Sequence, residues 1–231
     1  MKKIVLTGGG TAGHVTPNLA LIPRLQADGW EVHYIGAANS AEESLIARVP
    51  GVTFHAISVG KLRRYFDLKN FSDPFRVIRG VAQATRIIRQ LKPSVLFSKG
   101  GFVSVPVVYG ARLNGIPVLL HESDMSPGLS NRITAPLAEA MCCTFPEAVE
   151  LAGRKGRLTG TPLRDELFTG SREKGLRLFG FNEDRPVLMV MGGSSGAQAI
   201  NKALRAALSQ LVECFQVLHL CGKDNQDAEF E

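Results

Sequence analysis

Short apolar runs alternate with longer amphipathic segments along the chain of 231 residues. The short runs are rich in Val, Ile, Leu and Phe, which favours buried strands, whereas the longer segments repeat their apolar positions at helical spacing. The expected strands are residues 4–6, 32–35, 53–57, 95–97, 116–120, 140–144, 186–191 and 215–220, with a further extended stretch at 156–161. The expected helices are residues 16–28, 41–49, 74–91, 106–113, 171–179 and 199–212, and another helix begins within 125–132. Strands that alternate with helices are typical of an α/β fold around a parallel sheet.

A glycine-rich loop follows the first expected strand. It reads Gly8-x-Gly10-x-x-Gly13 and is followed directly by His14. Glycines at this spacing let the backbone turn and approach a ligand that a Cβ would block, while the N-terminus of the next helix favours an anion. The same spacing is a dinucleotide fingerprint, but that interpretation requires an acidic residue after the second strand, where Ala37-Ala38-Asn39 stands. A nicotinamide-dependent reductase is therefore the weaker alternative.

Two later strands lead into similar loops. Residues 95–97 run into Gly100-Gly101, and residues 186–191 run into a loop at 192–198 that echoes the first one. The first loop and the loop at 192–198 each mark the beginning of a Rossmann-like domain. The sequence therefore predicts two such domains, which we place at residues 1–163 and 164–231. Because the second part holds only about two strands, we expect it to pack on the first domain or to be the beginning of a larger domain.

The positive charge of the chain is concentrated in one stretch. The net charge is +6 overall, whereas residues 61–92 alone carry +7, from nine Lys or Arg and two Asp. The expected helix within this stretch has an apolar face and an arginine-rich face. Aromatic side chains beside basic ones favour an anionic membrane surface over nucleic acid, for which no base-reading motif is present, and an ordinary solvated helix is the other alternative. The membrane-binding candidates are Arg63, Arg64, Phe71, Phe75, Arg79 and Arg86.

The cysteines and the apolar runs bear on three further features: metal sites, membrane-spanning segments and signal peptides. Four cysteines, at 142, 143, 214 and 221, lack Cys-x-x-Cys spacing, so we expect no metal site and interpret all four as small core residues. No apolar run has the length that spans a bilayer, and the few residues before Gly8 are too short for a signal-peptide core. A cytosolic protein is the expectation.

Five segments carry a resemblance to a known family. They are residues 7–17, 99–104, 121–131, 160–164 and 192–201, and together they span nearly the whole chain in the same order. On these segments the sequence resembles the MurG family of N-acetylglucosaminyltransferases. The resemblance implies the GT-B fold, with two Rossmann-like domains around the active site. It also implies inverting transfer of GlcNAc from UDP-GlcNAc to the C4 hydroxyl of MurNAc in lipid I, forming lipid II, by a peripheral protein at the cytoplasmic face of the bacterial plasma membrane.

The resemblance also implies roles for individual residues. His14 and Glu122 match polar groups near the acceptor hydroxyl and are the catalytic candidates. Histidine suits a base near neutral pH, and whether His14, His121 or Glu122 takes the proton stays open. The substrate-binding candidates are Thr11, Gly13, Gly100, Gly101, Asp124 (where other members carry Asn), Asn131, Arg164, Ser194, Gly196 and Gln198. Because no Asp-x-Asp motif is present, we expect helix N-termini, and neither a metal nor a cofactor, to hold the diphosphate.

The second domain of that family continues beyond residue 231, where it holds the uracil and ribose pocket. The implied partners are UDP-GlcNAc, lipid I and an anionic membrane surface, without nucleic acid. We expect residues 1–231 to lack part of the donor site. A non-catalytic module that binds nucleotide sugars or lipids is therefore a further alternative.

Overall fold

The computed structural model describes residues 2–59, 73–193 and 196–226 of the chain. The chain divides into two compact units, Met1–Asp165 (the first unit) and Glu166–Glu231 (the second unit). The division lies two residues after the domain boundary that the sequence suggests. Within the described ranges, no helix has the length and apolar content needed to span a bilayer.

The first unit is built on a parallel sheet of seven strands in the order β3-β2-β1-β4-β5-β6-β7. The strands are β1 (Lys2–Thr7), β2 (Trp30–Ala37), β3 (Val52–Ile57), β4 (Val95–Ser98), β5 (Val118–Glu122), β6 (Ala140–Cys143) and β7 (Gly156–Leu158). The helices are α1 (Ala12–Ala27), α2 (Ala41–Ile46), α3 (Asp73–Leu91), α4 (Ser104–Leu113), α5 (Leu129–Thr134) and α6 (Pro146–Ala152), with 3-10 turns at Ala135–Leu137 and Gly153–Lys155. This architecture confirms the α/β fold with a parallel sheet.

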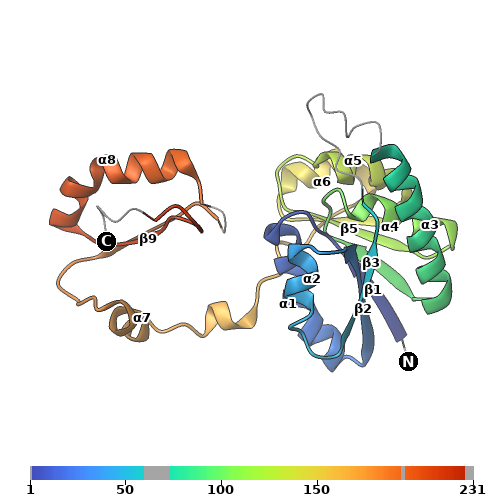
Figure 1. The fold of residues 1–231 in the computed structure, drawn as a ribbon, viewed down its shortest axis with the longest axis horizontal. Coiled ribbons are helices and arrows are strands. Elements are labelled where there is room, and N and C mark those ends of the chain that lie inside the picture. The colour runs from blue at the N-terminus through green and yellow to red at the C-terminus, as the bar shows by residue number, and fades with distance from the viewer. Residues whose placement is uncertain (1, 60–72, 194–195, 227–231) are drawn as a thin grey trace. The chain divides into compact units, whose positions relative to one another are not determined.

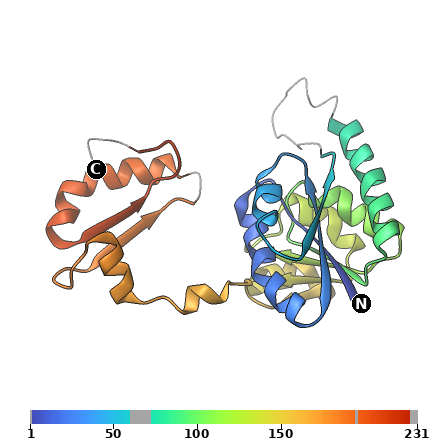
Figure 2. The same ribbon diagram turned by 60° about the horizontal axis from the view of Figure 1, so that its bottom comes forward.

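Helices cover both faces of this sheet, as Figures 1 and 2 show. α1 and α2 lie over a core that contains Ile4 and Leu6. α3, α4 and α6 lie over a second core that contains Val5 and Leu96. Neighbouring residues of β1 thus enter opposite cores, because successive side chains of a strand point to opposite faces. A sheet buried on both faces explains why the sequence shows uninterrupted apolar runs at its strands.

Two features of the helices differ from the sequence expectation. α1 begins at Ala12 instead of Thr16, so that His14 lies in its first turn. α6 (Pro146–Ala152) is absent from the expected elements, although a proline at the first helical position is a recognised start signal. The short length of α6 leaves it without a clear apolar periodicity, which is why the pattern does not reveal it.

The loops after β1 and β4 pack directly against each other. The N–H of Gly9 donates a hydrogen bond to the carbonyl of Gly100 at 3.4 Å. Gly101 has a φ of +83°, and a Cβ at this position would collide with the carbonyl oxygen of Gly9. Gly10 has a φ of +91°, and a Cβ there would collide with the ring of Phe102. We call this contact the glycine interlock. The glycines allow the two loops to meet, whereas the sequence suggested that they make room for a ligand.

The second unit contains one strand–helix–strand motif. β8 (Val187–Met191) pairs in parallel with β9 (Gln216–Leu220), and α8 (Gln198–Cys214) connects them. α7 (Arg172–Phe179) precedes β8, and a 3-10 turn spans Asp165–Phe168. These are the strands and helices expected from the sequence. Cys214 is exposed, so the expectation that all four cysteines are core residues is wrong for this one.

The loop after β8 repeats the close backbone approach of the first unit. Gly196 has a φ of +75°, and a Cβ there would collide with the carbonyl oxygen of Cys221, just beyond β9. The side-chain amide of Asn201 donates a hydrogen bond to the same carbonyl at 2.9 Å. The start of α8 is therefore tied to the end of the neighbouring strand through the backbone.

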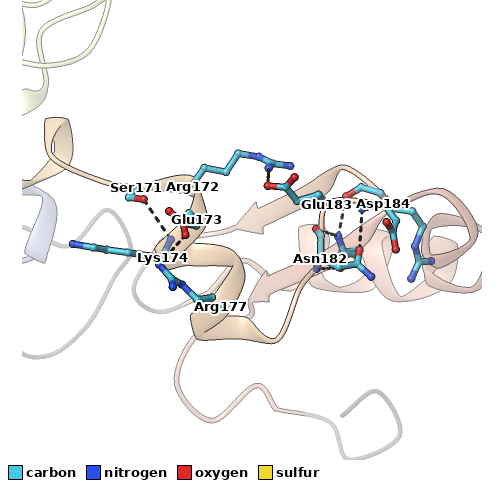
Figure 3. Close-up of polar contacts among 10 residues, drawn as sticks. Ser171, Arg172, Glu173, Lys174, Arg177, Asn182, Glu183 and Asp184 are labelled. Atoms are coloured by element: carbon cyan, nitrogen blue, oxygen red, sulfur yellow. Dashed lines mark hydrogen bonds and ion pairs between the residues drawn. The ribbon is translucent and has the colours of Figure 1, made fainter.

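Several polar side chains around α7 form hydrogen bonds and ion pairs, as Figure 3 shows. Arg172 pairs with Glu183 at 3.5 Å, and Arg177 pairs with Glu173 at 3.1 Å, one helical turn away. The hydroxyl of Ser171 caps the helix. All four charged side chains are mostly exposed, and ion pairs in that setting contribute little to stability.

Gly101→Ala is expected to destabilise the first unit more than Gly115→Ala. Both glycines have positive φ values, +83° and +70°. An alanine therefore carries a conformational cost of about 1–2 kcal/mol at either position. Only at Gly101 does the new Cβ also collide with backbone, since at Gly115 no atom of the described residues, apart from its chain neighbours, lies within 4 Å of the Cβ position. Urea unfolding followed by the fluorescence of Trp30, the only tryptophan of the chain, measures both variants. Equal losses of stability would contradict the interlock.

Candidate active site

The sheet changes its direction of winding between β1 and β4. From β1 the chain proceeds to β2 and β3 on one side, and from β4 it proceeds to β5, β6 and β7 on the other. In such a sheet the loops at the carboxyl ends of the two central strands diverge and leave a crevice for a ligand. A pocket of about 300 Å³ lies at this place. Eight of the sequence candidates line it: Thr11, Gly13, His14, Gly100, Gly101, Glu122, Asp124 and Asn131.

His14 lines the pocket from the first turn of α1. Its Nδ1 lies 2.9 Å from the hydroxyl of Thr11. Burial lowers the pKa of His14 below its usual value, and the ammonium of Lys99 adds to this, against smaller opposing effects of carboxylates that include Glu122 and Asp124. The imidazole is therefore neutral at pH 7. When Nδ1–H donates to Thr11, the Nε2 lone pair is free to accept a proton.

The carboxylate of Glu122 is held by three hydrogen-bond donors. Its Oε1 accepts from the backbone N–H of Asp124 at 3.0 Å. Its Oε2 accepts from the backbone N–H of Gly128 and from the side-chain amide of Asn131, each at 2.9 Å. These bonds close the loop 123–128 around the carboxylate, and we call the arrangement the Glu122 clasp. A carboxylate has about four acceptor positions, so most of them are already used.

The ring of His121 does not line the pocket. Its Nε2 bonds to the carbonyl of Gly160 at 2.9 Å, and its ring centroid lies 6.3 Å from that of Phe97. Burial lowers the pKa of His121, so its imidazole is also neutral at pH 7. His121 and Glu122 are neighbours in β5 and point to opposite faces of the sheet. Of the three candidate bases, only His14 and Glu122 can therefore touch a ligand in this pocket.

Lys99 lines the pocket although it is absent from the sequence candidates. The residue is only 4% exposed, and burial lowers the pKa of its ammonium below the usual value. A lysine in a loop is ordinarily solvated, which is why composition and pattern do not single it out. The available signal is its position directly before Gly100-Gly101, at the carboxyl end of β4.

Glu42 is a second residue that sequence reasoning missed. It lies in the first turn of α2, is 1% exposed and packs against Gly9 of the first glycine loop. Its carboxylate accepts the N–H of Gly10 at 3.5 Å and the N–H of Ala37 at 3.3 Å. Glu42 therefore stabilises the backbone of the first glycine loop and of the residue that ends β2. Glu42 stands three residues beyond Ala37-Ala38-Asn39, the segment that lacks the acidic residue of a dinucleotide fingerprint.

The remaining site candidates lie elsewhere or outside the described residues. Arg164 is exposed in the segment after β7 and does not line the pocket. Gly196 and Gln198 belong to the second unit, at the start of α8, where Gln198 is exposed. Ser194 lies outside the described residues. Among residues 2–59, 73–193 and 196–226, no group of three His, Cys, Asp or Glu side chains is placed to hold a metal ion.

Two family models match the chain. Residues 4–143 match the glycosyltransferase family 28 N-terminal domain, and residues 187–231 match the glycosyltransferase family 28 C-terminal domain. The chain belongs to glycosyltransferase family 28. Membership of this family favours a glycosyltransferase over the nicotinamide-dependent reductase that the sequence leaves as the weaker alternative.

Relatives and a solved structure agree with the family 28 assignment. The UDP-N-acetylglucosamine--N-acetylmuramyl-(pentapeptide) pyrophosphoryl-undecaprenol N-acetylglucosamine transferase of Clostridium novyi is 54% identical, over 99% of this chain and 64% of the relative. That of Clostridium tetani is 52% identical, over 100% of this chain and 64% of the relative. The crystal structure of Acinetobacter baumannii MurG is 28% identical with a TM-score of 0.71, over 97% of this chain and 60% of that one.

These comparisons confirm the resemblance to the MurG family and the GT-B class of fold. The chain spans 64% of the length of the curated relatives that it matches. A structure of UDP-GlcNAc 2-epimerase from Neisseria meningitidis has a TM-score of 0.64 at 15% identity, over 95% of this chain and 65% of that one, which shows a shared fold.

Substitution of Glu122 is expected to speed the hydrogen exchange of specific backbone amides in the family 28 pocket. Glu122→Ala removes the acceptor of both the Asp124 and Gly128 N–H groups, so both amides should exchange with solvent faster. Glu122→Gln keeps one oxygen, which can stay beside Gly128 and Asn131, so that only the Asp124 amide should be released. Amide hydrogen exchange resolved by NMR measures the difference. Unchanged exchange at both amides in Glu122→Ala would contradict the clasp.

Proposed function

We propose that this family 28 chain serves in the inverting transfer of GlcNAc from UDP-GlcNAc to the C4 hydroxyl of MurNAc in lipid I, which forms lipid II. The observation that carries this proposal is the 54% identity, along 99% of the chain, to a transferase whose name specifies these two substrates. The pocket at the carboxyl ends of β1, β4 and β5 supports it, because it presents a neutral histidine beside a cation and an uncapped helix N-terminus.

In this proposal the first unit binds the acceptor and His14 is the general base. Its Nε2 takes the proton of the C4 hydroxyl as the oxygen attacks the anomeric carbon of GlcNAc. The new C–O bond forms while the bond from the anomeric carbon to the UDP oxygen breaks, and UDP leaves with the electron pair. Attack on the side opposite to the leaving group accounts for inversion. The lowered pKa of His14 supports this role, since only the neutral ring can accept a proton.

We assign Glu122 a positioning role beside this base. Three donors already occupy its carboxylate, and these bonds hold the loop that carries Asp124. Thr11, Gly13, Gly100, Gly101, Asp124 and Asn131 are proposed acceptor contacts on the basis of their place in the pocket. By resemblance alone we propose that the loop at the start of α8, with Gly196, Gln198 and Ser194, contacts the donor and that Arg164 is a further substrate contact.

We further propose that α3 meets an anionic membrane at the cytoplasmic face. Phe75 is 75% exposed, and Arg79 and Arg86 follow it at helical spacing on the same exposed side. Ile78 is 67% exposed and Leu113 at the end of α4 is 68% exposed, and both line one apolar groove with Arg86. Large apolar side chains beside guanidinium groups suit the boundary of an anionic bilayer. The other three candidates, Arg63, Arg64 and Phe71, lie outside the described residues.

His14→Ala is expected to lower the turnover number by about 10²–10⁴-fold, the usual effect of losing a general base. The assay measures GlcNAc transfer from UDP-GlcNAc to a soluble lipid I analogue. It uses a chain in which residues 1–231 are followed by the part of the Clostridium novyi relative that lies beyond the match. UDP-GlcNAc binding should change little, because the proposed base acts on the acceptor.

His55→Gln is the matched control for this experiment. His55 is a partly buried histidine of β3 that bonds to His33 at 3.3 Å and does not line the pocket. Its variant should keep the wild-type turnover number. A His14→Ala protein that turns over like the wild type would remove His14 from the mechanism, and absence of transfer in the parent chain would refute the proposed function.

The double variant Arg79→Glu/Arg86→Glu is expected to weaken binding to vesicles that contain phosphatidylglycerol. Each basic residue near an anionic surface contributes about 1 kcal/mol, so removing two should weaken binding by about 30-fold or more at low salt. Vesicle co-sedimentation measures the partition of the protein.

The double variant Arg172→Glu/Arg177→Glu makes the same change in net charge on the exposed surface of α7 (Figure 3). It should bind vesicles like the wild type. Equal losses in the two double variants would show that net charge alone drives binding, and a wild type that ignores anionic vesicles would refute the α3 surface.

A further inference from the structure

The ammonium of Lys99 has no partner in the described part of the protein. The residue is 4% exposed and lines the pocket. Its electrostatic environment includes Glu122 and Asp124, but no hydrogen bond or ion pair to the ammonium is present among the described residues. A buried cation without a partner is unfavourable, and such groups are retained where they meet a counter-charge. Lys99 is also the only Lys or Arg among the described residues that line this pocket.

The glycine interlock fixes where the side chain of Lys99 starts. Its backbone N–H donates to the carbonyl of Thr7 at 2.9 Å, which ties it to the end of β1. The Cβ of Lys99 packs against the backbone of Gly8, where an added Cβ would lie only 3.0 Å away. The ammonium interacts electrostatically with Glu122 and Asp124, and both of these residues line the same pocket as Lys99. The backbone of two strands therefore fixes the point from which this side chain enters the pocket.

Two further groups in the pocket are donors to an anion. Thr11 precedes α1 with an extended backbone and makes no side-chain cap, so the first N–H groups of this 16-residue helix have no partner from the Thr11 side chain. Ser130 accepts a hydrogen bond from the N–H of Gly101 at 3.0 Å, which leaves its own O–H free to donate. Thr11, Gly13 and Ser130 line the same pocket as Lys99.

We propose that Lys99 pairs with a phosphate or diphosphate group of the substrate, together with the N-terminal amides of α1 and the hydroxyl of Ser130. Lys99 is thereby a positioning residue that holds the charged part of the substrate against the pocket while His14 faces the sugar. This inference rests on the proposed function in one respect, since both substrates of that reaction carry a diphosphate. The diphosphate belongs either to the lipid acceptor or to the nucleotide sugar.

The first test uses the wild-type protein and needs no variant. Limited acylation with acetic anhydride at pH 8, followed by peptide mass spectrometry, measures the reaction rate of Lys99 and of the exposed Lys174 in α7. Inorganic pyrophosphate at ten times its dissociation constant should slow the acylation of Lys99 by about tenfold, because only free sites react, and should leave Lys174 unchanged. An unchanged rate at Lys99 up to saturating pyrophosphate overturns the inference.

The second test uses variants and isothermal titration with inorganic pyrophosphate. Lys99→Met keeps the buried stem and removes the charge, and it should weaken binding by about 10–100-fold, the usual range for a charge-assisted hydrogen bond. Lys99→Arg should retain most of the affinity, and the control Lys174→Met should retain all of it. Circular dichroism and Trp30 fluorescence report whether Lys99→Met is folded. If Lys99→Met is not folded, the pyrophosphate affinity of Lys99→Arg and the acylation test decide whether the inference holds.

The acylation test also separates the two sources of the diphosphate. A short-chain lipid I analogue that protects Lys99 identifies the acceptor, and protection by UDP-GlcNAc identifies the donor, and either result supports the inference. If pyrophosphate protects Lys99 while no transfer is found, the inference stands and the proposed function fails. If transfer occurs but Lys99→Met keeps the wild-type KM for both substrates, the inference fails and the proposed function stands.

Discussion

The backbone contact between the first two glycine loops is the constraint on which the pocket depends. Gly101 sits against the carbonyl of Gly9, and this contact joins the ends of β1 and β4 at the point where the chain begins to wind in opposite directions. His14 follows one loop and Lys99 precedes the other, so this contact fixes the relative backbone positions from which the two side chains enter the pocket. A backbone contact is also stiffer than a contact between side chains, because no rotamer can relax it.

The polar groups of the pocket differ in how many hydrogen-bond or ion-pair partners the protein itself provides. The carboxylate of Glu122 is tied to a loop and an amide, and the carboxylate of Glu42 supports the backbone beneath the first loop. The imidazole of His14 has one partner, and the ammonium of Lys99 has none among the described residues. Groups whose hydrogen bonds are already used shape the pocket, whereas groups with remaining capacity are available for binding and chemistry. This division of labour resembles the preorganisation that active sites use to hold charge without rearrangement.

Much of the fold follows from the sequence, because a parallel sheet buried on both faces requires apolar strands between amphipathic helices. The pattern could not reveal α6, which is too short for periodicity, or the early start of α1. The glycines at 10 and 101 are found because they follow expected strands, but their reason is a contact between loops that are about ninety residues apart, which no local pattern contains. His14 is found because a histidine behind a glycine loop is unusual. Lys99 is missed because its burial depends on the same long-range contact.

The interlock has a consequence for how sequence variation in this family should be interpreted. Glycine at 101 is required by the neighbouring loop, so its persistence among homologues would arise from packing even if no ligand ever touched it. The same holds for Gly196 in the second unit, which faces the carbonyl of Cys221. Gly13 is different, because the nearest atom to an added Cβ is the Thr11 hydroxyl at 3.8 Å, and the protein itself would accommodate a methyl group. Invariance at position 13 would therefore be evidence of selection by a bound molecule, whereas invariance at positions 101 and 196 would not.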